Sequence, residues 1–219
     1  MKSLNNTRTI FFDYDGTLHN SIHIYAPAFQ KAYDYLVLNG CADKRDWSHK
    51  EISHWLGYNP TDMWKAFQPN LDEQIRQVCS EIIGEEMKNQ IICGKPMLYE
   101  GSLHTLEYLK NKGYQLVFIS NCKAYYMECH RELFHLEDYF ETMFCSEQFG
   151  YKPKYEILKS IKNDYKEQMA IVGDRRQDIE AGKKNNLITI GCRYGFGVWE
   201  ELKEADYIID DIRELEKLL

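Results

Sequence analysis

Short apolar runs alternate with segments of helical periodicity along most of this chain. The runs predict strands at residues 9–12, 114–120, 142–145, 169–173, 187–191 and 207–210. Residues 101–113 and 154–163, which lie between runs, place leucine, isoleucine and tyrosine at helical spacing. Continuous apolar strands separated by helices are typical of a sheet that is covered on both faces. The pattern therefore predicts an α/β fold with a doubly wound, mostly parallel, Rossmann-like sheet.

The interval from about residue 18 to residue 97 breaks this alternation, because it offers only helical patterns. Tyr25, Phe29 and Tyr33 lie on one stripe of its first helix, and three of the chain's four tryptophans fall inside the interval. An aromatic stripe of this kind is more often the core of a helical unit than a ligand site. We predict a Rossmann-like core at residues 1–17 and 98–219 and an inserted α-helical domain at residues 18–97.

The net charge and hydropathy of the chain limit the kinds of molecule it is expected to bind. The chain has 219 residues, 44% of them hydrophobic, and 27 basic against 34 acidic residues give a formal charge of -7. A surface of that charge repels polyanions, so we expect neither nucleic acid nor an anionic membrane as a partner. The sequence shows no signal peptide and no window with the roughly 18 apolar residues of a membrane span, which predicts a cytoplasmic protein. We expect a monomer or a homodimer.

Polar residues follow four of the predicted strands. They are Asp13 and Asp15, Ser120 and Asn121, Lys152, and Asp174 and Asp178. In a parallel sheet, the carboxyl ends of the strands meet in one crevice, so these side chains are expected to converge there. Taken alone, the aspartates and the Ser120–Asn121 pair also fit turns or helix caps, and Lys152 fits a solvated surface lysine. Four such groups in order, each at a strand end, are not explained by caps and turns.

The set resembles the haloacid dehalogenase-like hydrolase superfamily, whose four motifs are matched by "DYDGT", "FISN", "YKP" and "GDRRQD". The helical insert stands where that family carries its cap. A further likeness, "IGCRYGFG", points toward the phosphoglycolate-phosphatase-like subfamily. The resemblance implies an enzyme, a phosphatase that hydrolyses small phosphorylated metabolites, with Asp13, Asp15 and Lys152 as catalytic residues.

Physical reasoning supports that mechanism at these positions. Asp13 would attack phosphorus to form an aspartyl-phosphate, which water would then hydrolyse. Asp15 would protonate the departing alkoxide and later take a proton from the water. A free aspartate has a pKa of about 3.9 and is ionised at neutral pH, so we expect the neighbouring carboxylates Asp13, Asp174 and Asp178 to raise the pKa of Asp15.

So many carboxylates beside a phosphate require a cation, and hard oxygen ligands favour Mg²⁺. The resemblance implies that Asp13 and Asp174 bind it through their side chains and Asp15 through its backbone carbonyl. Asp178 would act through a water or through a hydrogen bond to one of the ligands. Lys152 would offset the remaining charge and hold the phosphoryl group. Ser120 and Asn121, with backbone N–H groups at a helix start, would bind phosphoryl oxygens.

Two residues depart from the family pattern: Asn20 stands where many relatives carry aspartate, and Arg175 where a small hydroxyl residue is usual. Other functions remain as alternatives. A sugar-phosphate mutase of the β-phosphoglucomutase type would share all four motifs, and a receiver-like domain would accept phosphate as a signal, although it needs no helical insert. A dehalogenase has no use for Asp15, and a phosphonate hydrolase would need a reactive lysine such as Lys31 or Lys65.

The substrate would be chosen by residues of the insert. Those with side chains suited to leaving-group oxygens are His19, His23, Tyr25, Lys31, Lys44, Arg45, Lys50, Lys65, Arg76 and Lys88. Helical spacing does not tell which of them point inward.

Overall fold

Six strands form one sheet in the order β3-β2-β1-β4-β5-β6 within the described part of the chain, and each neighbouring pair is parallel. The structure is a computed structural model that describes residues 3–58, 60–165 and 168–219. The strands are β1 (Thr7–Phe12), β2 (Gln115–Ser120), β3 (Thr142–Cys145), β4 (Gln168–Gly173), β5 (Ile188–Cys192) and β6 (Tyr207–Ile209). The predicted doubly wound, parallel α/β sheet is confirmed, with strand ends within two residues of their predicted positions.

The strand order reverses beside β1. From β1 the chain builds β2 and β3 on one side, and it then crosses over to place β4, β5 and β6 on the other side. Connections on the two sides of such a reversal lead away from each other and leave a crevice at the carboxyl ends of the two central strands. In this chain, the crevice lies where β1 and β4 end.

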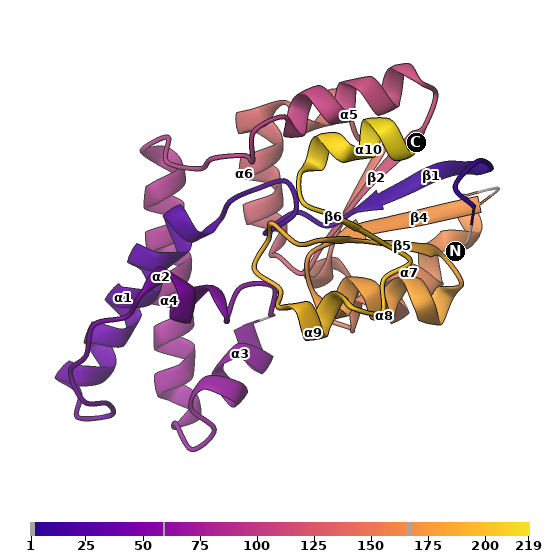
Figure 1. The fold of residues 1–219 in the computed structure, drawn as a ribbon. Coiled ribbons are helices and arrows are strands. Elements are labelled where there is room, and N and C mark those ends of the chain that lie inside the picture. Colours follow the sequence, from indigo (N-terminus) through magenta and orange to yellow (C-terminus); the bar gives the residue numbers. More distant parts are fainter. Residues whose placement is uncertain (1–2, 59, 166–167) are drawn as a thin grey trace. The chain divides into compact units, whose positions relative to one another are not determined.

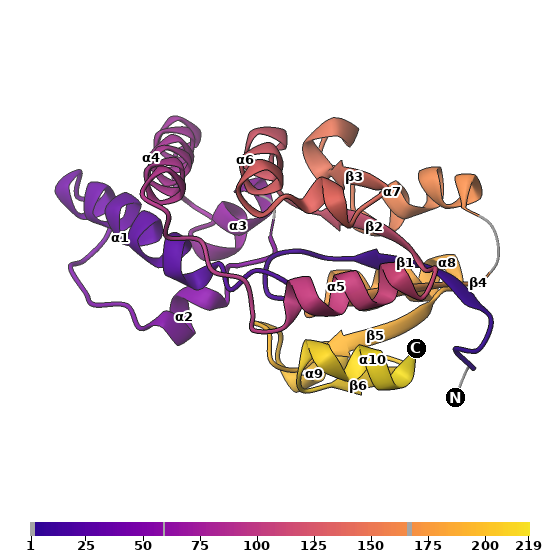
Figure 2. The same cartoon turned by 90° about the horizontal axis from the view of Figure 1, so that it is seen from above.

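Helices cover both faces of the sheet. They are α5 (Ser102–Asn111), α6 (Ala124–Phe134), α7 (Lys154–Ile161), α8 (Arg176–Asn185), α9 (Trp199–Leu202) and α10 (Leu215–Leu218). Figure 1 shows α5 and α10 on one side of the sheet and α7 and α8 on the other, and Figure 2 shows α10 running beside α5. Phe11 and Ile171 of the central strands pack with Leu158 of α7 and Ala181 of α8, all of them buried. Burial on both faces explains why the strands are continuous apolar runs.

A separate helical unit spans Asn20–Met97, and the sheet unit comprises Met1–His19 and Leu98–Leu219. The helices of the former are α1 (Ile22–Leu38), α2 (His49–Ser53), α3 (Pro60–Phe67) and α4 (Glu73–Ile92). Its start falls two residues after the predicted residue 18. None of the described helices has the length and hydropathy that a bilayer span requires.

The aromatic stripe of α1 packs inside the helical unit. Phe29 contacts Trp47 and Phe67 edge to face, with ring centroids 5.4 Å apart in both pairs. Trp55 contacts Phe67 at 5.2 Å, and Trp64 is buried, donating from Nε1 to the Ser80 hydroxyl at 2.8 Å. These rings stabilise the unit through burial and edge contacts.

We predict that Leu158→Ala lowers the free energy of unfolding by about 2–5 kcal/mol, because Leu158 is fully buried and its loss leaves a cavity. Leu133→Ala is the matched control: Leu133 also lies in a helix of the sheet unit but is 41% exposed, so we expect a loss below about 1 kcal/mol. Urea unfolding followed by circular dichroism measures both. Equal losses for the two variants would contradict this packing.

Candidate active site

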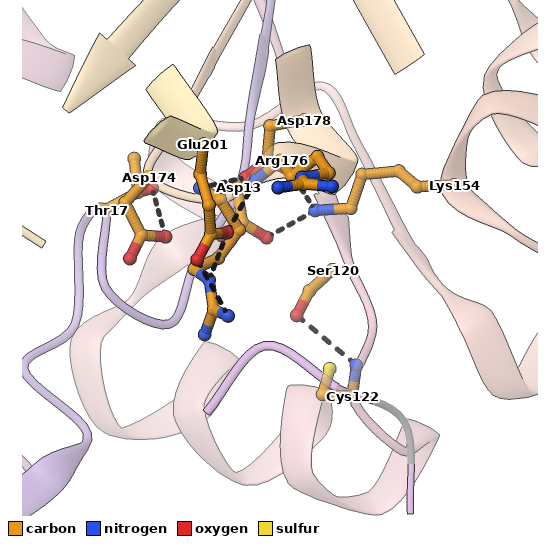
Figure 3. A network of polar contacts seen from close by, with 10 residues as sticks. Asp13, Thr17, Ser120, Cys122, Lys154, Asp174, Arg176, Asp178 and Glu201 are labelled. Carbon is orange, nitrogen blue, oxygen red and sulfur yellow. Dashed lines mark hydrogen bonds and ion pairs between the residues drawn. The ribbon is translucent and has the colours of Figure 1, made fainter. Parts of the chain in front are cut away.

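Three predicted residues lie together at the crevice between β1 and β4. Asp13 directly follows β1, and its N–H donates to the Val172 carbonyl of β4 at 2.9 Å. Asp174 directly follows β4, and Ser120 is the last residue of β2. All three side chains are buried. Figure 3 shows them around a common space, as expected from the convergence of parallel strand ends.

The lysine of this site is Lys154, not the predicted Lys152. The ammonium Nζ of Lys154 lies 2.6 Å from Oδ1 of Asp13 and 2.5 Å from Oδ1 of Asp178, and its side chain is 2% exposed. Figure 3 shows it reaching between the two carboxylates. Lys152 is exposed. Pro153 separates the two lysines and stands at the N-cap of α7, so Lys152 lies outside the helix, whereas Lys154 is its first residue.

Asp13, Asp174 and Asp178 form a buried acidic cluster, with one carboxylate oxygen of each within 4.8 Å of the others. Burial and the charge of Asp178 raise the pKa of Asp13 to about 7, although Lys154 opposes the shift. Burial and the charges of Asp13 and Asp178 raise the pKa of Asp174 well above its ordinary value. Three carboxylates facing one ammonium carry excess negative charge in a place with little water.

The donor set fits a small divalent cation. It consists of carboxylate oxygens, the ligands that Mg²⁺ prefers, and a cation would offset the burial and the mutual repulsion that raise the pKa values of Asp13 and Asp174. Asp178 already accepts hydrogen bonds from Lys154 and from the Arg175 N–H, which is 2.9 Å from Oδ2. Asp13 and Asp174 are therefore better placed than Asp178 to be direct ligands.

Glycine backbone surrounds Asp174. A Cβ at Gly16, where φ is +89°, would stand 2.2 Å from Oδ2 of Asp174, and one at Gly197 would stand 1.8 Å from the Asp174 carbonyl oxygen. No side chain fits at such distances, so both positions require glycine. The N–H of Phe196 donates to Oδ2 of Asp174 at 2.6 Å. The loop after β1 and the loop after β5 thus fix this carboxylate from two sides.

Asp15 has a different environment from Asp13. Its Oδ1 accepts hydrogen bonds from the Tyr126 hydroxyl at 2.8 Å and from Nδ1 of His19 at 3.0 Å. Burial raises the pKa of Asp15, but the hydrogen bonds from His19 and Tyr126 outweigh burial and hold the pKa below its ordinary value. The expectation of a raised pKa is therefore wrong for this arrangement, because the groups nearest to the carboxylate are donors rather than carboxylates.

Ser120 ends β2, and Asn121 begins the turn between β2 and α6. The Cys122 N–H donates to Oγ of Ser120 at 3.3 Å, which leaves the Ser120 hydroxyl proton for another acceptor. The Asn121 carbonyl accepts from the Ser146 hydroxyl at 2.9 Å. This contact fixes the Asn121 backbone, while a role of its side chain in phosphate binding stays a prediction.

The residues that depart from the family pattern have structural partners. Arg175 is buried and forms two hydrogen bonds with Glu201 of α9, Nε to Oε2 at 2.9 Å and Nη2 to Oε1 at 3.3 Å. It ties α9 to the start of α8. Asn20 begins the helical unit, and its N–H donates to the Met97 carbonyl at 2.8 Å.

The sequence alone did not identify Lys154 and Tyr126 as residues of this site, and it assigned His19 a different position. Lys154 stands at the first position of a predicted helix, and only the turn at Pro153 decides which lysine enters the crevice. Tyr126 comes from α6, 111 residues from Asp15, and no local pattern connects the two. His19 was predicted in the insert as a candidate for substrate contact, but it belongs to the sheet unit, is fully buried and binds Asp15.

Comparisons with known proteins agree with this geometry. Residues 10–192 match the family model described as haloacid dehalogenase-like hydrolase. The chain is 27% identical to a phosphoglycolate phosphatase of Aquifex aeolicus, over 86% of each chain. It is 26% identical to the pyrophosphatase PpaX of Oceanobacillus iheyensis, over 95% of this chain and 94% of the relative. A crystal structure of a predicted phosphatase from Clostridium acetobutylicum superposes with a TM-score of 0.83 and 25% identity, covering 96% of this chain and 97% of the other.

We predict that Lys154→Met destabilises the protein by about 3–5 kcal/mol in metal-free buffer at pH 7, because it leaves the acidic cluster without its cation. Lys152→Met removes the same charge two residues away from an exposed position, and we expect a change within about 0.5 kcal/mol. Urea unfolding in the presence of a chelator measures both. Similar values for the two variants would refute the assignment of Lys154.

Proposed function

Because the chain belongs to the haloacid dehalogenase-like hydrolases, we propose that it is a Mg²⁺-dependent phosphatase that hydrolyses small phosphorylated metabolites through an aspartyl-phosphate on Asp13. The observation that carries the proposal is the pairing of Asp13 with Lys154 inside the acidic cluster at the strand reversal. A buried carboxylate whose ammonium partner also faces the crevice is equipped both to attack a phosphoryl group and to neutralise it.

Lys154 prepares Asp13 for the attack. It holds Oδ1 of Asp13 at 2.6 Å, while Oδ2 has no hydrogen bond to any described residue. One oxygen is thereby fixed, and the carboxylate keeps a single orientation toward the crevice. In the first step, the bond from the Asp13 oxygen to phosphorus forms as the bond from phosphorus to the leaving oxygen breaks, and in the second, water returns Asp13 to its free form.

The metal would be held by Asp13 and Asp174, with Asp178 beside them and the Asp15 carbonyl as a further ligand. When bound, Mg²⁺ neutralises charge on the carboxylates and on the phosphoryl oxygens. Lys154 reduces the electrostatic repulsion between Asp13 and Asp178, since its ammonium bridges the two carboxylates. Ser120 donates its hydroxyl proton to a phosphoryl oxygen, since its Oγ already accepts a hydrogen bond from the Cys122 N–H.

Asp15 carries the proton in both steps. In the second step, it takes a proton from the attacking water, for which the ionised form favoured by His19 and Tyr126 is suited. The proton gained there is the one given to the leaving oxygen in the next first step. A bound phosphate ester raises the pKa of Asp15 through its negative charge, so the carboxyl retains the proton until the ester bond breaks.

The substrate class is a small phosphate ester or phosphoanhydride. The relatives named above include a phosphoglycolate phosphatase and a pyrophosphatase at nearly equal identity to this chain. We therefore propose phosphoglycolate and pyrophosphate as the first substrates to assay. Release of inorganic phosphate supports a phosphatase, while return of an isomeric phosphate with little free phosphate would show a mutase instead.

We predict that phosphate release stops when a chelator is added and returns with Mg²⁺. Ca²⁺ should support it poorly, because its larger and looser coordination suits the transferring phosphoryl group less well. Asp174→Asn should raise the Mg²⁺ concentration needed for half-maximal activity, whereas Asp164→Asn, at an exposed position, should not. Full turnover in metal-free buffer would end this proposal.

We predict that Asp13→Asn abolishes activity while the fold is retained, because the amide keeps the shape of the side chain and removes the nucleophile. The variant should also fail to acquire labelled phosphate when it is denatured rapidly during turnover, in contrast to the unaltered protein. Circular dichroism checks the fold. If the variant kept a tenth of the activity, Asp13 would be only a ligand.

A further inference from the structure

One oxygen of Asp15 is held by two donors from different parts of the sheet unit. His19 follows the loop after β1, and Tyr126 lies in the first turn of α6. Nδ1 of His19 and the Tyr126 hydroxyl lie 3.0 Å from each other and within 3.0 Å of Oδ1 of Asp15. His19 is fully buried, and Tyr126 is 9% exposed. The three polar atoms form a closed triangle.

A layer of rings behind the triangle fixes His19. The Tyr14 ring stacks on the His19 ring with centroids 5.2 Å apart and an interplanar angle of 18°, and the His130 ring meets His19 at 4.6 Å. Nδ1 of His130 lies 2.6 Å from the Tyr14 hydroxyl. Burial lowers the pKa of His130 to about 3, so this ring is neutral. His19 therefore has little room to turn away from Asp15.

This arrangement is not optimal for stability. The Nε2 atoms of His19 and His130 are buried and have no hydrogen-bond partner among the described residues. An unsatisfied buried polar atom destabilises a fold, and apolar side chains of similar size would pack there without that penalty. The presence of His19 and His130 at these buried positions is explained if His19 has a functional role at Asp15.

The two donors share one oxygen of Asp15. Both act on Oδ1, and Oδ2 has no hydrogen bond to a described residue. A carboxyl group whose Oδ1 accepts two hydrogen bonds can carry its own proton only on Oδ2. The Asp15 side chain is 19% exposed, so it is accessible from the solvent side.

We propose that His19 and Tyr126 are positioning residues that hold Oδ1 of Asp15 so that Oδ2 is the atom that transfers the proton. The inference rests on the proposed phosphatase function. In the first step, the Oδ2 proton passes to the leaving oxygen while the bond from that oxygen to phosphorus breaks and Asp13 bonds to phosphorus. In the second, the water that attacks phosphorus gives its proton to Oδ2, which restores the acid form.

The test compares two leaving groups in pre-steady-state experiments with substrate in excess and Mg²⁺ present. An alkyl phosphate needs the proton when its alkoxide departs, whereas 4-nitrophenyl phosphate loses a stable anion and hardly needs it. Tyr126→Phe and His19→Leu should slow the first step about 10- to 100-fold for the alkyl phosphate, as expected for a misplaced catalytic group, with KM nearly unchanged. The nitrophenol burst should keep its amplitude and lose less than threefold in rate.

Matched controls separate positioning from packing. His19→Asn can place an amide donor near the position of Nδ1 and should restore most of the alkyl phosphate rate that His19→Leu loses. Tyr108→Phe removes a hydroxyl that donates to the Glu216 carbonyl at 3.2 Å, and His104→Leu removes a 71% exposed ring. Both should behave as the unaltered protein. The burst amplitude counts folded sites, so a poorly folded variant is recognised and its rate is corrected.

The outcomes for the inference and for the proposed function are distinct. If Tyr126→Phe and His19→Leu slow both substrates equally, or neither, while the unaltered protein is active, His19 and Tyr126 only fill space and the inference is wrong. If the unaltered protein shows no release of phosphate that depends on Asp13, the proposed function is wrong and the inference falls with it.

Discussion

Three buried carboxylates facing one buried ammonium are the interaction on which this site depends. Asp13, Asp174 and Asp178 approach one another because β1 and β4 are neighbours at the strand reversal, and Lys154 offsets only part of their charge. The sheet supplies the rigidity that holds like charges together, and glycine loops let backbone close around Asp174. We therefore expect a bound cation to stabilise this cluster by offsetting the negative charge that Lys154 leaves.

Two aspartates only two residues apart receive opposite environments from the same fold. Asp13 faces other carboxylates and a lysine, and its pKa is raised, whereas Asp15 faces a histidine and a tyrosine, and its pKa is lowered. Positions two residues apart in an extended segment point to the same side, so the different surroundings of Asp13 and Asp15 show that the chain leaves the extended conformation here, next to the turn at Gly16. The pKa of each carboxylate is therefore set by burial and by its own contacts more than by the mutual repulsion of Asp13 and Asp15.

The sheet and the acidic residues were predictable because both follow from local patterns. Apolar runs fix the strands, and residues that follow parallel strands share one edge, which places Asp13, Ser120 and Asp174 without knowledge of helix packing. The choice between Lys152 and Lys154 depends on the direction of the chain after Pro153, which spacing does not determine. The partners of Asp15 depend on the docking of α6 beside the loop after β1, a contact between residues more than 100 positions apart.

The stereochemical course at phosphorus is the measurement that tests the central claim most directly, namely that Asp13 is a nucleophile within the carboxylate cluster. The substrate would be an alkyl thiophosphate made chiral with oxygen isotopes and hydrolysed in isotopically labelled water. Each in-line displacement inverts the configuration, so transfer to Asp13 and then to water predicts net retention. Net inversion would show a single attack by water and would contradict the account.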